Sequence, residues 1–464
     1  MKPFLLFFLI LVVFASCKKD KFTEDAGSGL VFSDDTLMFD TVFTTIGSAT
    51  RYFKIYNNNS QDLKIKRIYL AGNNGFRLNI NGSSTNSLQD VIIKENDSLF
   101  IFVEVNVNPL SSNSPLTILD SVMFETNDKT DKVILMACGQ DVHLIDGEII
   151  SDDVWVNDKP YLIYNSMLVD SNATLIITSG VRLYFHNESR LYVAGTLIVN
   201  GSLEEPVIFQ GDRLEQWYKD IPGQWDGLYF LPGSKDNSLT YCEVKNAIIG
   251  IQADTMASVL QPTVTMLNSK ILNMNAVGIY GRGTSIHAVN CVISNAGQYA
   301  VAVVYGGSYE FYHCTIYNDW SYSNRVTPSV VLNNYYQDAY GVYQVRPLEK
   351  ATFGNCIIYG SKEDEIVLDE YSGSPIFNYW FDHCLMKTNT ALNTNDANHF
   401  IGNFKNISPG FISASTGDFE LDTLSNSKDK GNFTIGNSFP MDFLNHSRVS
   451  SGAPDLGAYE SEFD

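Results

Sequence analysis

Apolar and polar residues alternate in short runs along the first third of the chain, with turn sequences between the runs. Residues 57–59 (NNN) and 72–75 (GNNG) are two such turns, because Asn and Gly tolerate the left-handed backbone conformation. The run from Leu99 is apolar on both faces at its start, which predicts a central strand. We therefore expect a small β-sandwich over residues 30–145, with strands near residues 50–56, 63–70, 99–107, 121–125 and 132–137.

From residue 146 the pattern changes to a repeat with a period near 22 residues. Residues 173–177 (ATLII) return 22 positions later as residues 195–199 (GTLIV). This period fits one coil of a right-handed parallel β-helix, in which successive coils stack about 4.8 Å apart. The prediction is an all-β chain: the β-sandwich is followed by a right-handed single-stranded parallel β-helix over residues 146–464.

In a second motif, a polar residue comes directly before a Cys or Ser, and another polar residue follows that Cys or Ser four positions later. Equivalent positions of stacked coils form columns, so the small side chains predict an interior ladder and the Asn residues predict turns. One of the steps between successive Cys-type positions, from Cys314 to Cys356, is 42 residues long, which fits two coils or one coil with a long insertion. The Cα–Cα distance between stacked coils permits a Cys291–Cys314 disulfide. Parallel side chains are poorly oriented for an S–S bond, however, which favours free thiols. The Cys-type positions, spaced by 27, 22, 23, 42 and 28 residues, are Cys242, Ser269, Cys291, Cys314, Cys356 and Cys384.

The N-terminus predicts export. An apolar run of 12 residues, 4–15, is too short to span a bilayer as a helix but suits a signal peptide. It ends in Ala15-Ser16-Cys17, which resembles the lipobox of bacterial lipoproteins and implies a lipid on Cys17. We expect a signal peptide over residues 1–16, a polar tether over 17–29 and an outer-membrane lipid anchor as the only membrane contact. The alternative is ordinary secretion with a free Cys17, and surface or periplasmic orientation stays open.

The sandwich segment resembles the Ig-like domains found beside flagellar and centrosomal proteins and in many Bacteroidetes lipoproteins. The resemblance rests on residues 53–57 (FKIYN), 75–78 (GFRL), 105–109 (VNVNP) and 124–127 (FETN). It implies a domain that binds a partner or acts as a spacer. None of these residues forms a catalytic constellation.

The repeat segment resembles pectate-lyase-like β-helix lipoproteins of Bacteroidetes. Residues 193–201 (VAGTLIVNG) and 225–230 (WDGLYF) look like that family's opening coils, and residues 454–460 (PDLGAYE) look like its C-terminal closure. The resemblance implies the fold, but the same fold hosts lyases, hydrolases, adhesins and non-enzymes. Function therefore has to come from a site.

Two aromatic-rich insertions, residues 210–224 and 309–343, are the candidate sites. Aromatic rings stack on the apolar faces of sugars, and loops often carry binding residues. The structural alternative is that both insertions seal the side of the helix. The candidate glycan-binding residues are Trp217, Tyr218, Lys219, Trp320, Tyr322, Arg325, Tyr335 and Tyr336.

Charge and composition exclude several partners. With 52 acidic and 31 basic residues the net charge is −21, which argues against nucleic acid and against charge-driven adhesion to anionic lipid. There is no CxxC or HxxxH spacing, so no metal site is expected. A lyase on this fold would use a Lys or Arg base, often with Ca²⁺ held by Asp; no other cofactor is implied.

Asp-Thr/Ser-aliphatic triplets resemble the O-glycosylation sequon of Bacteroidetes envelope proteins. Short triplets also arise by chance. The candidate sites are Thr36, Thr41, Ser98, Ser121, Thr255 and Thr423.

The expected function is that of an exported, monomeric, non-catalytic lipoprotein. It would bind a polysaccharide or an envelope or surface protein along the flank of the β-helix. The alternative is a polysaccharide lyase or glycoside hydrolase acting in a groove of the helix. No spacing in the sequence ties an acid to a base, so no catalytic residue is assigned.

Overall fold

The chain forms two compact units, Met1–Val142 and His143–Asp464. The computed structural model describes residues 22–23, 30–44, 46–108, 116–126, 129–254, 261–374, 376–389, 392–450 and 452–461. The expected signal peptide, Cys17, all of the tether except residues 22–23, and Thr255 lie outside the described residues. Within the described part, no helix is both long enough and apolar enough to cross a membrane.

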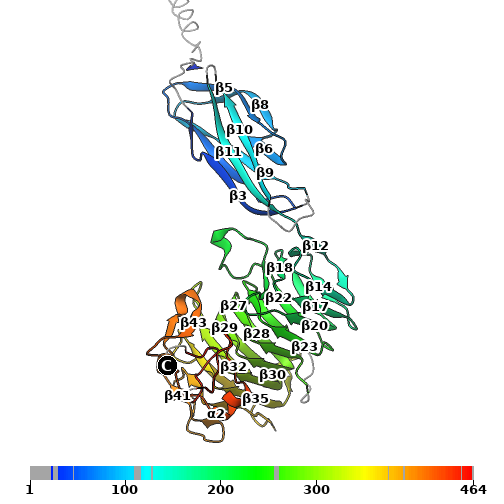
Figure 1. Cartoon of the computed structure of the whole chain (residues 1–464), viewed down its shortest axis with the longest axis vertical. Helices are drawn as coiled ribbons and strands as arrows, with labels where there is room; N and C mark the ends of the chain where they lie inside the picture. Colours follow the sequence, from blue (N-terminus) through cyan, green and yellow to red (C-terminus); the bar gives the residue numbers. More distant parts are fainter. Residues whose placement is uncertain are drawn as a thin grey trace, which may run out of the picture. The chain divides into compact units, whose positions relative to one another are not determined.

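The first unit is a β-sandwich, as the sequence predicts (Figure 1). Phe53 and Ile101 from one sheet share a core with Ile65 and Val133 from the other. The six-stranded sheet contains β1 (Phe22–Thr23), β3 (Thr36–Phe43), β5 (Asp62–Leu70), β8 (Ser87–Ile93), β10 (Leu116–Glu125) and β11 (Thr130–Gln140). The five-stranded sheet contains β2 (Val31–Phe32), β4 (Arg51–Asn57), β6 (Phe76–Ile80), β7 (Ser83–Ser84) and β9 (Asp97–Val105).

Among the described residues of the sandwich, six strands, β1, β2, β3, β6, β7 and β8, were not among the predicted ones. β3 ends its sheet and β8 pairs only with β5, and strands in such positions need no strong apolar alternation. The β9 strand is central, as predicted, but it is not buried on both faces. Phe100 and Phe102 are each 37% exposed on its outer side.

The second unit is a parallel β-helix, in which each coil crosses an 11-stranded sheet and a 17-stranded sheet (Figure 1). The 11-stranded sheet contains β12 (His143–Asp146), β15 (Tyr161–Tyr164), β18 (Arg182–Phe185), β21 (Val207–Gly211), β24 (Cys242–Lys245), β27 (Lys270–Met274), β29 (Val292–Ala296), β31 (Thr315–Asn318), β36 (Ile357–Gly360), β39 (Leu385–Met386) and β41 (Phe404–Lys405). The 17-stranded sheet contains β13 (Ile149–Ile150), β14 (Asp153–Trp155), β16 (Met167–Val169), β17 (Thr174–Thr178), β19 (Arg190–Val193), β20 (Thr196–Asn200), β22 (Gly227–Phe230), β23 (Asn237–Thr240), β25 (Ile249–Ala253), β26 (Val264–Leu267), β28 (Val277–Val289), β30 (Tyr299–Tyr312), β32 (Val330–Asn333), β35 (Leu348–Gly354), β37 (Ile366–Asp369), β38 (Trp380–Asp382) and β40 (Phe400–Ile401).

The strand register confirms the repeat. Thr174 pairs with Thr196, one period of 22 residues later. Thr315 pairs directly with Ile357, so the 42-residue step is one coil with a long insertion. That insertion carries the hairpin of β33 (Tyr335–Gln337) and β34 (Tyr343–Val345).

The predicted Cys and Asn columns are both present. The Cys column from Cys242 to Cys384 is buried and its thiols are free, so the free-thiol alternative is confirmed. Asn268 and Asn290 adopt positive φ angles of 48° and 53° at consecutive turns. The Asn290 side chain donates a 2.9 Å hydrogen bond to the Asn268 side chain, which links the two coils.

Most of the described C-terminal residues, 411–450 and 452–461, lie on the outer face of the 11-stranded sheet, whereas Phe439 packs on His287 and Tyr312 of the 17-stranded sheet. This covering segment includes β42 (Phe411–Ser413), a 3₁₀ turn at Ala414–Thr416, β43 (Asp418–Leu421) and the short helix α2 (Phe433–Ser438). Its apolar side chains form two buried clusters with the outward residues Val292 and Ile357. The segment that resembles a family closure therefore covers a flank of this helix.

Candidate functional site

The first insertion, residues 210–224, projects from a corner between the two sheets. It contains a 3₁₀ turn at Gln216–Tyr218. Trp217 is 61% exposed and Lys219 is exposed, whereas Tyr218 is half-buried beneath the guanidinium of Arg213, 3.9 Å from its ring. Trp225, which follows the insertion, is fully buried and stacks on Phe185.

The second insertion reaches the first through Tyr322. The Tyr322 hydroxyl donates a 2.6 Å hydrogen bond to the backbone carbonyl of Asp220, which lies 102 residues earlier. Tyr322 is 55% exposed, so it joins Trp217, Tyr218 and Lys219 in one surface at this corner. We call these four residues the corner patch.

Two of the candidate glycan-binding residues in the second insertion are buried. The guanidinium of Arg325 is only 1% exposed and donates to both oxygens of Glu365, at 2.7 and 2.8 Å. Trp320 is also buried, and its ring nitrogen donates to Ser323. Both side chains are therefore inaccessible to a glycan. Arg325 helps to hold the insertion in place, because the carboxylate of Glu365, 40 residues further on, reaches under the loop and pairs with it.

The candidates Tyr335 and Tyr336 lie in the β33–β34 hairpin, at the end of the 17-stranded sheet's strands. Tyr336 is 44% exposed, and its ring meets the ring of Tyr305 edge-on at 4.6 Å. The Tyr335 hydroxyl donates a 2.9 Å bond to Asp369, which raises the pKa of Tyr335. These two tyrosines are separate from the corner patch.

Sequence reasoning missed the tyrosines that lead up to this hairpin. Tyr192 pairs with Tyr229 on the next coil, and Tyr280 occupies the same column two coils further on. All three are half-buried on the outer face of the 17-stranded sheet. Together with Tyr305 and Tyr336 they form what we call the tyrosine row.

Polar groups lie between the rings of the tyrosine row. One oxygen of Asp254 accepts hydrogen bonds from the Tyr229 hydroxyl at 2.6 Å, from Arg282 at 2.7 Å and from Gln252 at 3.2 Å. Burial and this bond raise the pKa of Tyr229 to about 12, so the hydroxyl stays protonated. The Nε–H of Arg346 donates to the Tyr305 hydroxyl at 2.9 Å. The row therefore offers ring faces together with fixed donors and acceptors.

Arg282 lies within the continuous strand β28. The strand bends immediately after it, where Gly283 has a φ of +57° and the register shifts. The bend brings the backbone of Gly283 against Tyr305. Arg282 is thereby placed between the early tyrosines and the hairpin.

An ionisable group also occupies the outer face, near the middle of the helix. Glu310 contacts His287 at 3.5 Å and accepts hydrogen bonds from Lys350 and, at 3.1 Å, from the Tyr312 hydroxyl. The hydrogen bond with His287 is the main cause that lowers the pKa of Glu310 to about 2. A carboxylate with that pKa stays ionised, which excludes it as a general acid near neutral pH.

The family of the chain follows from its repeat. The family model described as "Right handed beta helix region" matches residues 134–320 and 261–427, which together make up more than half of the chain. The chain belongs to this family. The β-helix is therefore right-handed. The two matched ranges overlap at residues 261–320, within the coils that carry Tyr280 and Tyr305.

Two solved structures give only distant similarity. A family 123 glycoside hydrolase from Clostridium perfringens, described for glycolipid glycan hydrolysis, is 9% identical over 28% of this chain and 30% of its own, with a TM-score of 0.20. The ASH/PapD-like domain 7 of human CEP192 is 7% identical over 27% of this chain and 92% of its own, with a TM-score of 0.18. Such scores carry no argument about this β-helix protein. No curated protein matches it.

Metal and modification sites add little to the site. No cluster of three or more His, Cys, Asp or Glu side chains that could hold a metal occurs among the described residues. Of the candidate O-glycosylation sites, Thr36 and Thr423 are exposed, whereas Thr41, Ser98 and Ser121 are partly exposed. Their modification stays a prediction.

Proposed function

We propose that this right-handed β-helix protein is a monomeric envelope lipoprotein that binds a glycan along the tyrosine row. The supporting observation is the row itself, in which Tyr192, Tyr229 and Tyr280 share one outer column of a rigid sheet, and the rings of Tyr305 and Tyr336 contact each other at the hairpin. The anchor on Cys17 would hold it at the outer membrane, and the sandwich would act as a spacer. A protein partner from the envelope or cell surface is the alternative ligand.

A glycan fits the chemistry of the row. Sugar rings present apolar faces that stack on aromatic side chains, and their hydroxyls need nearby donors and acceptors. Gln252, Asp254 and Arg282 provide both kinds of group beside the rings. The strands hold these groups in fixed positions, so little side-chain entropy is lost on binding. The corner patch, with Trp217 and Tyr322, is a second exposed aromatic surface.

A glycan array probed with the full chain tests the proposal. For any glycan bound, we expect Tyr336→Ala and Tyr280→Ala each to weaken binding by about 3- to 10-fold, the equivalent of one lost ring contact. Tyr69→Ala in the sandwich is the matched control and should bind normally. Unchanged binding in both row variants would move the site elsewhere, and Trp217→Ala would then test the corner patch.

A polysaccharide lyase or hydrolase is the second candidate, because Lys350, His287 and Tyr312 surround one carboxylate on an outer face. The test is an assay for new reducing ends and unsaturated uronates over a polysaccharide panel. Turnover that is lost in Lys350→Met and retained in Lys245→Met would establish the enzyme and overturn the non-catalytic proposal. Lys245 is a suitable control because it also pairs with a carboxylate, Glu243, on another flank.

The lipid anchor has its own test. Metabolic labelling with a lipid analogue should mark the wild-type chain and leave Cys17→Ser unlabelled. Label that persists in the variant, or is absent from the wild type, would refute the anchor. The glycan proposal would then stand without it.

A further inference from the structure

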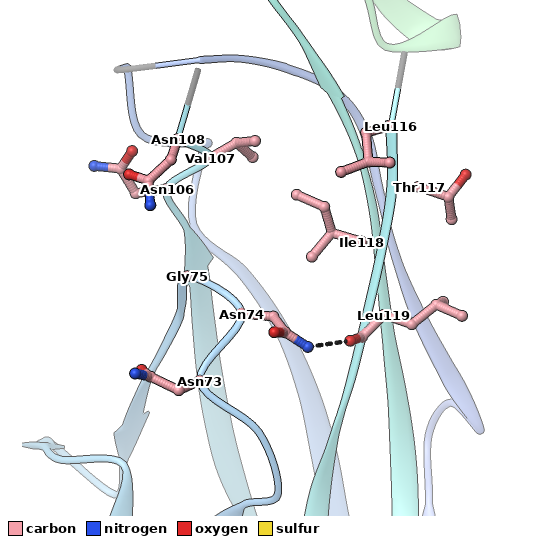
Figure 2. Close-up of a pocket in the computed structure, with 10 residues that line it drawn as sticks. All are labelled: Asn73, Asn74, Gly75, Asn106, Val107, Asn108, Leu116, Thr117, Ile118 and Leu119. Carbon is pink, nitrogen blue, oxygen red and sulfur yellow. Dashed lines mark hydrogen bonds between the residues drawn. The ribbon is translucent and has the colours of Figure 1, made fainter. Parts of the chain in front are cut away.

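The first unit carries a cavity of about 400 Å³ at one end of the sandwich (Figure 2). One wall is the turn at residues 73–75, and the other is the start of β10, from Leu116 to Leu119. The Asn74 side chain bridges the walls by donating a 2.8 Å hydrogen bond to the Leu119 carbonyl, drawn as a dashed line in Figure 2. This cavity belongs to neither the tyrosine row nor the corner patch.

The backbone of β10 is open along this wall. β10 pairs with β11 from Leu116 onwards, but it pairs with β5 only from Val122. The Ser121 carbonyl accepts from Ala71, so Ser121 faces the β5 side. Alternate residues of a strand direct their backbone groups to the same side, so Leu119 and Thr117 face it too. Within the described residues no strand pairs with them there.

The lining of the cavity has a definite chemistry. Val107 and Ile118 point their aliphatic side chains into the cavity and Asn74 reaches across it to Leu119, whereas the side chains of Asn73, Asn106 and Asn108 project away from β10 (Figure 2). Among the described residues, no charged residue lines it. A charged ligand would therefore lose its hydration without gaining an ionic partner. The cavity suits an uncharged ligand that can form many hydrogen bonds.

We propose that this cavity binds an uncharged polypeptide segment in extended conformation, which adds as a strand to the open edge of β10. The ladder would use the N–H and C=O of Thr117 and the N–H of Leu119, because an exposed edge is a template for strand addition. The aliphatic surface of Val107 and Ile118 receives alternate side chains of the added strand. The site lies outside the glycan-binding proposal and stands or falls separately from it.

To test the proposal, the full-length protein is used as bait to select peptides from a phage-displayed library of random dodecapeptides. We expect uncharged, β-branched sequences, whose synthetic versions slow amide hydrogen exchange at residues 116–119 by at least 10-fold. Ile118→Trp, which fills the cavity, should weaken binding at least 10-fold. Ile92→Trp, the same change at an exposed Ile on β8, should leave it unchanged.

A second variant guards against misfolding. Thr117→Pro removes one edge N–H while keeping β10 paired with β11 on its other side, so it should also weaken binding. The proposal is overturned if no peptide is selected, if the selected peptides are charged, or if neither variant affects them. Normal glycan binding by Ile118→Trp would show that the two sites are independent.

Discussion

The two outer faces of the β-helix differ in what covers them. On the 11-stranded sheet, one outward column runs through Glu243 and Lys270 in the early coils and through Val292, Ile357 and Leu385 in the late coils. The first two are half-buried, and the last three are fully buried beneath the covering segment. The column also includes Thr315, which accepts a hydrogen bond from the Ala458 N–H, and Lys270 lies over the ring of Phe443. The covering segment therefore packs on polar as well as aliphatic residues of this column.

The 17-stranded sheet keeps much of its outer face accessible. Its corresponding column carries Tyr192, Tyr229, Gln252 and Tyr280, which are half-buried and surrounded by ion pairs. Amphipathic rings suit a surface that stays in contact with water and can also receive a ligand. The column continues as Ala302 and Val331, which are buried beside Tyr280 without any contribution from the covering segment. The two outer faces therefore differ in that one is buried by the end of the chain and the other largely by its own side chains.

The largest expected effect comes from breaking the covered face. Arg448 is fully buried and donates to Glu460 at 3.3 Å and to Asn290 at 3.0 Å. Arg448→Ala leaves buried carboxylates without a cation, so the free energy of opening of the covering segment should fall by about 3–5 kcal/mol. Hydrogen exchange at residues 442–460 measures it. Arg282→Ala on the open face should cost less than about 1 kcal/mol, and equal costs would refute the comparison.

The next effect is a pH dependence of opposite sign on the two faces. Burial and the nearby Asp455 outweigh Arg448 and raise the pKa of Glu460 to about 8. The folded state then holds a proton that the unfolded state loses, so stability should fall by roughly 2–4 kcal/mol as the pH rises from about 4.5 to 8. Hydrogen exchange of the covering segment across this range checks the prediction. In Glu460→Gln the slope should disappear.

On the outer face of the 17-stranded sheet the sign of the pH dependence reverses. The pKa of Glu310 is lowered to about 2, so its contribution is present above the unfolded value of about 4.5 and is lost as the pH falls towards 2. Chemical denaturation between pH 5 and pH 3 should show a loss of roughly 1–3 kcal/mol that is absent in Glu310→Gln. If the wild type and Glu310→Gln lost stability equally between pH 5 and pH 3, the loss would come from other carboxylates.

The smallest stability effect should come from the tyrosine row. Tyr280→Ala removes a half-buried ring from an accessible face and should cost about 1 kcal/mol or less, whereas Ile357→Ala beneath the covering segment should cost about 2–4 kcal/mol. Urea denaturation of the two variants measures the difference. A larger cost at Tyr280 would mean that the row supports the fold more than it serves binding.

The period of the sequence was enough to predict the interior. Cys291 and Cys314 stack because small side chains recur at one coil's spacing, and Asn268 and Asn290 form their predicted ladder for the same reason. The outer face was harder to predict. Tyr192, Tyr229 and Tyr280 share a column although 37 and 51 residues separate them, because insertions of unequal length hide the period.

The burial of Arg325 shows a second limit of sequence reasoning. Its aromatic neighbourhood suggested an exposed site, yet Glu365 on the next coil pairs with it inside the loop. Only the register between coils reveals such a partner. Tyr322 and Tyr336, from the same insertion, do reach the surface, so exposure differs from residue to residue within it, and its binding role stays a prediction.

The coil between Thr315 and Ile357 closes in register over 42 residues as well as its neighbours do over 22 or 23. The scaffold therefore tolerates changes of length at this point. The β33–β34 hairpin can be shortened, lengthened or exchanged as a cassette while the coils above and below keep their partners. The length of this insertion can therefore change without altering how the strands of the coil pair with the coils on either side.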